Sequence, residues 1–328
     1  MVVTLAEVAA RAGVSGSTVS RALFDPDKVS AATRQHVLQV AAAMGYVPNH
    51  AARSLASGHT DVIGLMVPDI ANPFFPPIIK AVQMRAAAHG KTVLIADADE
   101  RPGDELVRAQ AMRRHSDGLI VASPRVAEDR LSELSDLSPI VFINREVRSS
   151  PSVMIDADEG MRQAGEHLAA LGHRHICYLN GPERSWSNVL RRNALRAMCA
   201  KLGVRLTELG PFEPEVQAGV NAADLVLASG ATAAIAYDDL IALGLMGRLN
   251  ERGVKVGDGV SVVGVDDSPM SAMAYPTLTS VHVPGREAGV RAVDLLLQLL
   301  DKGREQDAAP SVFKTYLVVR GSTGPPPR

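Results

Sequence analysis

The sequence predicts an α + α/β protein: a small bundle of three helices at the N-terminus, followed by a larger α/β core in two lobes. The first 60 residues contain short amphipathic helical patterns separated by Gly, Ser and Pro. From Val62 onward, apolar runs rich in β-branched residues alternate with helical patterns, which is typical of parallel sheets covered on both faces. A length of 328 residues is sufficient for two or three hydrophobic cores.

Composition narrows the class of protein. Apolar residues make up 46% and charged residues 21% of the chain, as in an ordinary globular protein. There is no apolar run of the roughly 18 residues that a membrane span needs, and the N-terminus lacks the features of a signal peptide, so we expect a cytoplasmic location. Cys177 and Cys199 lack metal-ligand spacing and are expected to be buried, reduced thiols. No metal or cofactor is predicted.

Charge is distributed unevenly along the chain. The net charge of −2 argues by itself against a nucleic-acid partner. Residues 1–60 contain five Lys and Arg against three Asp and Glu, a net of +2, which leaves −4 for the remainder. This weak asymmetry permits nucleic-acid binding by the N-terminal segment but does not establish it.

Two short helices are predicted before residue 25. The first begins in "TLAE", a capping box in which Thr4 caps free amides and Glu7 reaches back to the Thr4 amide. Gly13 ends this helix, and Ser15 caps the next. The inward faces are apolar, with Leu5, Val8, Ala9 and Ala12 in the first helix and Val19, Ala22 and Leu23 in the second. This arrangement indicates a helix-turn-helix.

The outward face of the second helix carries Ser17, Ser20 and Arg21 and no acidic residue. Short hydroxyls can bond phosphates, and an arginine can reach the two acceptors on a guanine edge. The pattern therefore favours DNA binding. The alternative is an ordinary solvated helix in a small bundle.

A third helix is predicted between Ser30, its N-cap, and Gly45. Its apolar stripe consists of Val37, Val40, Ala41 and Met44. Three such helices make a minimal bundle of about 45 residues, which is marginally stable alone.

Three stretches carry a family resemblance: "VTLAEVAARAGVSGSTVSRAL", "VSAATRQHVLQVAAAMGYVPNHAARSL" and "IGLMVPDIANPFF". They resemble the lactose-repressor (LacI/GalR) family of bacterial transcription regulators, densely over residues 2–77 and more loosely further on. The resemblance implies that the second helix enters the major groove of DNA, with Gly16, Ser17 and Arg21 at the base-reading positions. It also implies contacts to the DNA backbone from Thr4, Ser15, Thr18, Ser20, Ser30, Thr33, Tyr46 and Asn49.

Two residues of the N-terminal segment depart from the family pattern. Gly16 has no side chain, so one usual reading position is blank and permits only a close approach. Phe24 replaces a common asparagine, which removes a phosphate donor. The Phe24 ring either packs in the bundle, which we favour, or touches DNA.

The segment at residues 49–60 has the composition of a linker, yet "AARSL" within it is a good helix former. About two turns of helix can form there, too few to be stable in isolation. The resemblance implies a hinge helix in which Leu55 enters the minor groove, with Arg53 near the DNA backbone. The alternative is that Leu55 packs on the neighbouring core.

The core is predicted to contain about ten strands in two series, which indicates two α/β lobes. The recognisable strands are "VIGLMV", "TVLIAD", "DGLIVAS", "PIVFIN", "SVMID", "HICYLN", "TAAIAY" and "VSVVGV". Helices of the second series are predicted near 159–171, 187–202, 239–252 and 284–301. The resemblance implies a periplasmic-binding-protein-like core with a small-molecule effector in the cleft between the lobes.

These patterns divide the chain into three parts. Residues 1–48 are expected to form the helix-turn-helix domain, 49–60 the hinge helix and linker, and 61–328 the core that binds the effector and dimerises. Within the core, lobe one spans about 61–156 and 285–313 and lobe two about 160–281, with crossings near 157–160, 282–285 and 313–317.

Polar residues follow the strands of the core, at the edge where open α/β sheets bind ligands. Asp and Asn suit a polyhydroxylated ligand there, although they also commonly cap helices. With the resemblance, the expected effector contacts are Asp69, Asn72, Phe74, Asn144, Trp186, Arg191, Asp238 and Asp266. Asp238 replaces the usual Asn of the family, so a carboxylate that only accepts hydrogen bonds stands in place of an amide. We favour a sugar or sugar acid over a purine because aromatic residues make up only 4% of the chain.

No catalytic motif is evident, so an enzyme is not predicted. The sequence has no Gly-rich phosphate loop, no H-E-x-x-H and no G-x-S-x-G. His173 and His175 flank Arg174 at the start of a strand and are expected to be surface residues.

The preferred hypothesis is a homodimeric transcription regulator that binds a palindromic operator under the control of the effector. We favour repression, because a bound dimer blocks polymerase without further parts. The ending "GSTGPPPR" has no leucine-rich helix after it, so a dimer is expected and not a tetramer. The alternatives are a sugar-binding receptor that does not bind DNA, and a family member controlled by a partner protein.

Overall fold

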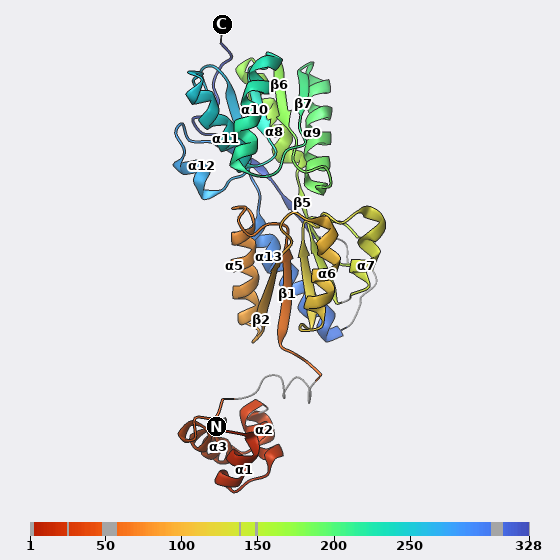
Figure 1. Cartoon of the computed structure of the whole chain (residues 1–328), viewed down its shortest axis with the longest axis vertical. Coiled ribbons are helices and arrows are strands. Elements are labelled where there is room, and N and C mark those ends of the chain that lie inside the picture. The colour runs from red at the N-terminus through yellow and green to blue at the C-terminus, as the bar shows by residue number, and fades with distance from the viewer. Residues whose placement is uncertain are drawn as a thin grey trace. The chain divides into compact units, whose positions relative to one another are not determined.

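The computed structural model of the chain describes residues 3–24, 26–47, 58–137, 139–147, 150–302 and 311–327. Asn49, Arg53 and Leu55 of the expected hinge lie outside these residues. The chain divides into two compact units, Met1–Thr60 and Asp61–Arg328 (Figure 1). Each unit has hydrophobic clusters of its own.

The N-terminal unit is a bundle of three helices, α1 (Leu5–Ala12), α2 (Gly16–Phe24) and α3 (Ala31–Ala43), with a short 3-10 turn, η1 (Pro26–Lys28), between the last two. Val8, Val19, Ala22 and Val37 are fully buried at its centre. These are residues from the apolar stripes of all three helices, which is why the bundle closes around them.

The helix ends in this unit are those predicted from sequence. Thr4 and Glu7 form a reciprocal capping box at the start of α1, and Gly13 ends the helix with a left-handed φ of 66°. Ser15 Oγ accepts a hydrogen bond from the Thr18 amide at 3.2 Å. Ser30 caps α3 in the same way. Side-chain caps therefore satisfy amides that short helices would otherwise leave free.

Lobe one of the core is built on a six-stranded parallel sheet in the order β11-β5-β4-β3-β1-β2. Its strands are β1 (Val62–Val67), β2 (Thr92–Asp97), β3 (Gly118–Ala122), β4 (Ile140–Ile143), β5 (Ser152–Asp156) and β11 (Ser311–Lys314). Its helical segments are α5 (Phe75–Ala87), α6 (Pro102–Arg113), η2 (Glu128–Arg130), α7 (Leu131–Ser135) and α13 (Gly285–Lys302). Strands β3 and β4 are buried along their whole length because helices cover both faces of the sheet.

Lobe two has a second six-stranded sheet, in the order β12-β10-β9-β8-β6-β7, in which only β12 runs antiparallel to its neighbour. Its strands are β6 (His175–Leu179), β7 (Arg205–Leu209), β8 (Ala233–Ala236), β9 (Ser261–Asp266), β10 (Thr279–His282) and β12 (Tyr316–Val318). Its helices are α8 (Asp158–Leu171), α9 (Trp186–Leu202), α10 (Val216–Ser229), α11 (Asp239–Glu251) and α12 (Pro269–Met273).

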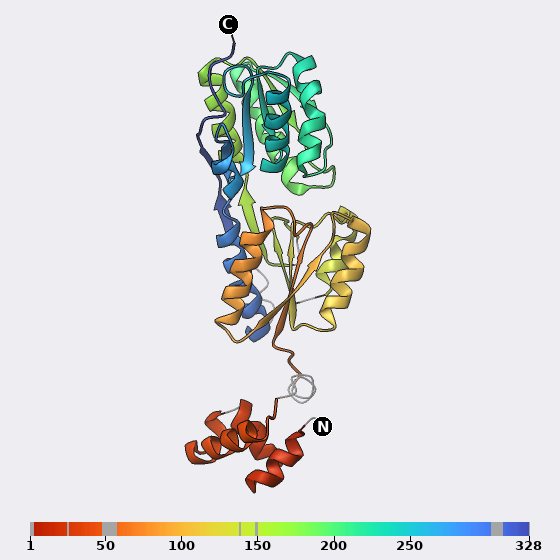
Figure 2. The ribbon, with the colours of Figure 1, turned by 60° about the vertical axis from the view of Figure 1, so that its left-hand side comes forward.

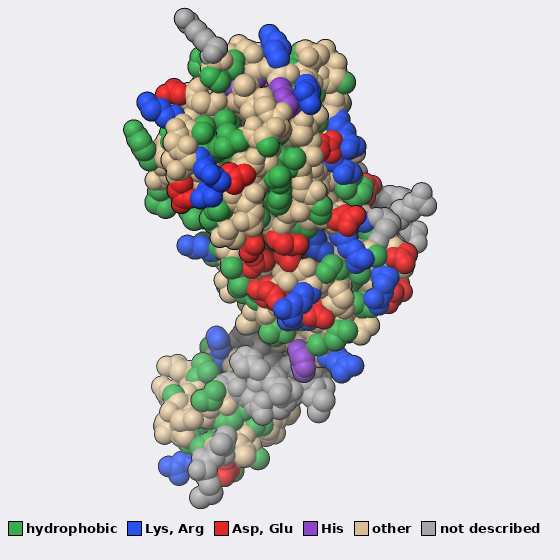
Figure 3. Space-filling model, turned by 45° about the horizontal axis from the view of Figure 1, so that its top comes forward, with side chains coloured by type: hydrophobic (Ala, Val, Ile, Leu, Met, Phe, Trp, Pro, Cys, Tyr) green, Lys and Arg blue, Asp and Glu red, His purple; other side chains and the backbone are tan. Residues whose placement is uncertain are grey.

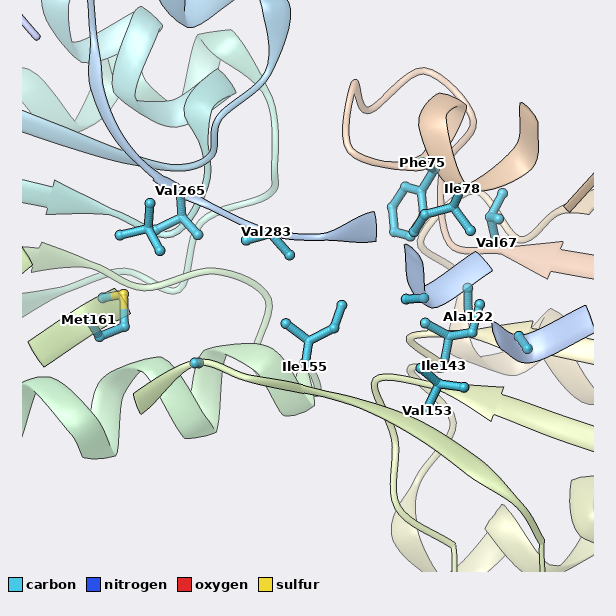
Figure 4. Close-up of a cluster of buried hydrophobic side chains, with 14 of the residues drawn as sticks. Val67, Phe75, Ile78, Ala122, Ile143, Val153, Ile155, Met161, Val265 and Val283 are labelled. Atoms are coloured by element: carbon cyan, nitrogen blue, oxygen red, sulfur yellow. The ribbon is translucent and has the colours of Figure 1, made fainter. Parts of the chain in front are cut away.

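Three segments of the chain connect the lobes: β5 leads into α8 at Ala157, β10 leads into α13 before Gly285, and β11 leads into β12 at Thr315. Helix α13 thereby returns to lobe one and packs beside α5, far from it in sequence (Figure 2). Ile155 and Val283 lie on two of the connections, between apolar side chains of the two lobes (Figure 4). One hydrophobic cluster therefore runs through the junction.

Several elements of the core were missed by the sequence patterns. The patterns do not identify the helices α10 and α12 or the strands β7 and β10, and they predict one C-terminal strand that crosses between the lobes near 313–317 where the structure has β11 and β12. These strands are only three to five residues long and carry polar side chains. Their assignment depends on pairing with a distant strand, which a local pattern does not reveal.

The prediction that His173 lies on the surface is wrong. Its side chain is buried, with Nδ1 2.8 Å from Thr232 Oγ1 and Nε2 2.9 Å from the carbonyl oxygen of Gly324. The ring thus ties the C-terminal segment to lobe two, and burial lowers its pKa. His175 is half-buried.

Helices α10 and α11 pack closely because each presents a glycine to the other. A Cβ added to Gly219 would collide with the carbonyl oxygen of Ile241, and one added to Gly244 would collide with that of Val216. Close contact between two helix backbones therefore requires glycine at both positions.

We expect Gly244→Ala to lower the free energy of unfolding by about 3 kcal/mol, because the added methyl group forces two helix backbones apart. Gly247→Ala in the same helix is the matched control, since no atom lies within 4 Å of its added Cβ. Alanine should stabilise that position by about 1 kcal/mol. Urea unfolding followed by circular dichroism measures both, and similar losses in the two variants would contradict the packing argument.

Candidate functional site

The exposed face of α2 carries Ser17 and Arg21, and Ser20 beside them is half-buried. Acidic residues are absent from α2 itself. The face therefore presents one guanidinium and several hydroxyls, without a carboxylate of its own helix to repel phosphate.

Hydroxyl groups cluster at the N-terminus of α2. Ser15 Oγ lies 2.8 Å from Ser17 Oγ and 2.8 Å from Thr18 Oγ1. At the start of α3, Ser30 Oγ lies 2.8 Å from Thr33 Oγ1. Helix N-termini carry free amides and a partial positive charge, so both clusters stand where anions bind favourably.

The other residues of this unit that were considered for contact with DNA are Thr4, Tyr46 and Phe24. Thr4 is exposed at the start of α1, where its amide and hydroxyl both donate to Glu7. Tyr46 is half-buried against the core of the bundle. Phe24 is also half-buried.

The blank position Gly16 has a packing role. A Cβ there would lie 3.3 Å from Cδ2 of Leu5, tighter than an ordinary van der Waals contact. The first turn of α2 thus approaches α1 closely, and a side chain at residue 16 would push against Leu5. The small residue at this place is explained within the bundle itself.

In the core, the predicted effector residues lie at the carboxyl ends of strands, in the segments that follow them, or in the first two turns of helices at the junction between the lobes. Asn72, Asn144, Arg191 and Asp238 are buried, and the side chain of Asp266 is 8% exposed. The half-buried residues are Asp69, Phe74 and Trp186. The carboxyl ends of both sheets thus contribute to one polar junction.

Direct contacts between the lobes close this junction. Asn72 Nδ2 in lobe one donates to Asp238 Oδ2 in lobe two at 3.2 Å. Asn144 Nδ2 donates to Ser187 Oγ at 2.6 Å. Predicted effector residues therefore bond across the junction, so a ligand that binds them must replace these bonds.

Arg191, on α9, contacts Tyr237 and Asp266 on lobe two's side of the junction. Its Nη1 donates to the carbonyl oxygen of Tyr237 at 2.5 Å, and its Nη2 lies 3.4 Å from Asp266 Oδ1. The guanidinium also stacks 4.8 Å from the centre of the Tyr237 ring. The long distance to Asp266 leaves this ion pair weakly formed.

Burial dominates the titration of the carboxyl groups here. It raises the pKa of Asp238 from 3.8 to about 7, although the Ile241 amide, Arg191 and Asn72 favour the charged form. Burial also raises the pKa of Asp266 well above its usual value, against the effect of Arg191. Burial therefore favours the protonated form of both carboxyl groups.

Backbone strain gathers at the same place. Asn144 has a φ of 56°, Asp266 a φ of 113° and Ser123 a φ of 45°, all in the left-handed region. Residues other than glycine adopt this region at a cost, and such residues cluster at functional sites. Each of the three stands at or just after the carboxyl end of a strand that faces the junction.

Two cavities border the junction and meet at Val283. The smaller includes Asn144 and Arg191 in its lining. The larger, of about 220 Å³, includes Phe74 and Asp266. The structure therefore does not bring the eight predicted residues around one cavity: Asp69, Asn72, Trp186 and Asp238 line neither.

Acidic side chains lie together near this junction. Asp97, Asp99 and Glu100 raise the pKa of Asp69 within lobe one, in addition to burial. Glu100 has the same effect on Glu213 of lobe two. Figure 3 shows acidic side chains on the surface near the middle of the core.

Sequence reasoning missed four residues of the junction: Arg125, Arg145, Ser187 and Tyr237. Arg145 stacks with its guanidinium carbon 4.5 Å from the centre of the Trp186 ring. Arg145 and Ser187 directly follow Asn144 and Trp186, so adjacency to a predicted contact was an available signal. Arg125 had no such signal, because only the fold brings it to Tyr237.

Within the described ranges, no helix is long and apolar enough to cross a membrane. In the same residues, His, Cys, Asp and Glu form no group of three that could hold a metal ion.

Comparison with known proteins identifies the two parts of the chain. Residues 4–49 match the model of bacterial regulatory proteins of the lacI family, and residues 166–323 match a periplasmic binding protein-like domain. The transcriptional regulator DegA of Bacillus subtilis is 31% identical over 99% of both chains. The chain belongs to the LacI family.

Other members of the LacI family agree with this. The transcriptional repressor CytR of Escherichia coli is 31% identical over 98% of this chain and 96% of its own. The lac repressor dimer bound to operator and the anti-inducer ONPF superposes with a TM-score of 0.87, at 28% identity over 99% of this chain and 100% of the other. Curated relatives of this LacI family member are transcription regulators and not enzymes. The chain is thus a DNA-binding regulator with a ligand-binding type of core.

The raised pKa of Asp238 predicts a pH-dependent effect of Asp238→Asn on stability. The folded chain holds a proton here up to about pH 7, whereas the unfolded carboxyl loses it near 3.8. Folding therefore binds a proton between these values, and stability from this group falls as the pH rises through them. We expect the melting temperature of the variant, relative to wild type, to be more favourable at about pH 8 than at about pH 5.

The exposed Asp258 supplies the control for this measurement. Asp258→Asn should change the melting temperature equally at both pH values. A difference for Asp238→Asn that does not change with pH would contradict the assignment of a buried, protonated carboxyl group.

Proposed function

We propose that this chain is a repressor that binds operator DNA through α2. Binding of a small polar effector between the lobes of the core lowers or raises its affinity for the operator. The observation that carries the proposal is the acid-free face of α2, with Arg21 and hydroxyls, on a chain whose core has a polar junction between two lobes. A cytoplasmic location fits this function.

The DNA-binding role is assigned to residues 1–48, the hinge to 49–60 and effector binding to 61–328. Ser17 and Arg21 read bases, while Gly16 allows close approach. Leu55 of the hinge enters the minor groove, and Arg53 lies beside it near the DNA backbone. The backbone contacts are Thr4, Ser15, Thr18, Ser20, Ser30, Thr33, Tyr46 and Asn49.

The effector is a sugar or sugar acid, bound by Asp69, Asn72, Phe74, Asn144, Trp186, Arg191, Asp238 and Asp266. Buried Asp and Asn groups accept and donate hydrogen bonds as vicinal hydroxyls require. The names of similar proteins support this class: the ribose operon repressor of Bacillus subtilis is 30% identical over 96% of this chain. A LacI family regulator from Enterococcus faecium with bound ribose has a TM-score of 0.72.

A homodimer is the working form. Met84 and Leu94 in lobe one are 59% and 39% exposed, and Met273 and Tyr275 in lobe two are 75% and 94% exposed. Their elements, α5, β2 and the region of α12, appear on the same side of the core in Figure 1. Large apolar side chains exposed on both lobes are typical of a surface covered by a second copy. Two copies would place two α2 helices on a palindromic operator.

Effector binding changes DNA affinity through the angle between the lobes. A ligand that replaces the bonds between Asn72 and Asp238, and between Asn144 and Ser187, alters how lobe one sits on lobe two. Lobe one is the lobe that continues from the hinge at Asp61. By linkage, effector and operator change each other's affinity by the same factor.

The base-reading role of Arg21 is tested by Arg21→Ala. Loss of an arginine contact to a guanine edge costs about 2 kcal/mol, or roughly thirtyfold in Kd, because the variant cannot donate to both acceptors. Arg11→Ala is the matched control, since it removes the same charge from an exposed position of α1. Fluorescence anisotropy with fragments of the promoter of its own gene measures both.

Two outcomes of this experiment argue against the proposal. Equal losses in the two variants would mean that Arg21 supplies only charge. If wild type forms no salt-sensitive, sequence-specific complex with any fragment, the chain is instead a ligand receptor that does not bind DNA.

The effector class is tested by thermal shift with neutral sugars, sugar acids and nucleosides. We expect at least one sugar or sugar acid to raise the melting temperature. The shift should be lost in Arg191→Lys, which keeps the charge but not the planar fork, and retained in Arg196→Lys on the exposed side of the same helix. A response to nucleosides alone would contradict the sugar class, and no response at all favours control by a partner protein.

A further inference from the structure

Arg125, at the end of lobe one's sheet, makes a contact with lobe two that uses none of the proposed effector ligands. It follows β3, and its side chain is 3% exposed. Nε and Nη2 donate to the two carboxylate oxygens of Glu100 at 2.7 and 2.9 Å, and Nη1 donates to the Ser123 carbonyl oxygen at 3.0 Å. The remaining direction of Nη2 points to the hydroxyl of Tyr237 in lobe two, at 3.5 Å.

The backbone of lobe one holds Arg125 firmly in this position. The buried carboxylate of Glu105 accepts hydrogen bonds from the amides of Arg125 and Val126, at 2.8 and 2.7 Å. A guanidinium fixed by a bidentate carboxylate and by its own backbone loses little entropy when it makes one further bond. Arg125 is therefore a preorganised donor aimed at lobe two.

Tyr237 passes this contact to helix α9. Its hydroxyl lies 2.9 Å from Ser185 Oγ, and Ser185 caps α9 by accepting from the Asn188 amide at 3.2 Å. Arg125 can only donate, so the Tyr237 oxygen accepts from it and the Tyr237 proton is free to go to Ser185. The result is a directed chain of polar contacts from lobe one to the N-terminus of α9, and its first link, from Arg125 to Tyr237, is long for a hydrogen bond at 3.5 Å.

Helix α9 carries three side chains of the junction: Trp186, Ser187 and Arg191. The ring of Tyr237 also lies against the Arg191 guanidinium. The Tyr237 side chain therefore contacts Arg125 through its hydroxyl and Arg191 through its ring. We propose that Arg125 and Tyr237 are positioning residues that hold the lobes closed and fix α9 for effector binding. The proposed role in effector binding rests on the proposed function.

The chain has a built-in reporter for this contact, because Trp186 is its single tryptophan and stacks against Arg145 of lobe one. Opening of the lobes removes Arg145 from the indole and exposes Trp186 to water. Quenching of Trp186 fluorescence by acrylamide in the full-length protein therefore measures closure directly. It needs no knowledge of effector or operator.

We expect Tyr237→Phe to shift the ratio of open to closed lobes about fivefold toward open, because the variant removes the hydroxyl that links Arg125 to Ser185. Acrylamide quenching of Trp186 should rise. Arg125→Lys should act similarly, since lysine cannot contact Glu100 and Tyr237 with one fork. Ser132→Ala is the control, because it removes an exposed hydroxyl of α7 that lies outside the proposed sites and should leave quenching unchanged.

Circular dichroism separates closure from folding in the same samples. Raised quenching with unchanged far-ultraviolet spectra in Tyr237→Phe and Arg125→Lys supports the proposal. Quenching equal to wild type in both folded variants overturns it, and so does an equal rise in Ser132→Ala. None of these outcomes depends on DNA binding, so failure here and failure of the repressor proposal are distinguishable.

Discussion

Hydrogen bonding between buried polar side chains of the two lobes is the constraint on which the core depends. Two sheets direct their carboxyl ends at one junction, so Asn72, Asn144, Arg191 and Asp238 leave water together. Buried polar groups require partners, and two of these residues find one in the opposite lobe: Asn72 donates to Asp238, and Asn144 donates to Ser187. A molecule that enters must offer equivalent donors and acceptors. Selectivity for a polar ligand is therefore a consequence of how the lobes meet.

Apolar side chains also lie at the junction, where Ile155 and Val283 line the same small cavity as Asn144 and Arg191. Ile155 and Val283 belong to chain connections between lobes and to a cluster that continues into both sheets. Apolar packing at the connections favours contact between the lobes, and the polar bonds beside it are those that a ligand would replace. The apolar contacts at the chain connections are thus distinct from the polar bonds between the lobes that a ligand can replace.

The N-terminal unit is stabilised differently, because a bundle of this size has only a small hydrophobic core. Its centre consists of small and β-branched residues such as Val8, Val19 and Val37, and side-chain caps supply the ends of α1, α2 and α3. Gly16 also contributes to this packing, because the absence of a side chain there leaves room for Leu5. The polar face of α2 remains available for DNA.

The sequence by itself determined the helix-turn-helix, its caps and the alternating α/β core, because these depend on local periodicity and on capping residues. The contacts between distant side chains of the core could not be predicted from the sequence. The bond between Asn72 and Asp238 joins residues 166 positions apart, and Arg125 meets Tyr237 across 112 positions. His173 was predicted to be a surface residue, but the C-terminal segment covers it in the folded chain. Such contacts arise from chain crossings and sheet order, which no local pattern encodes, so only the folded chain decided them.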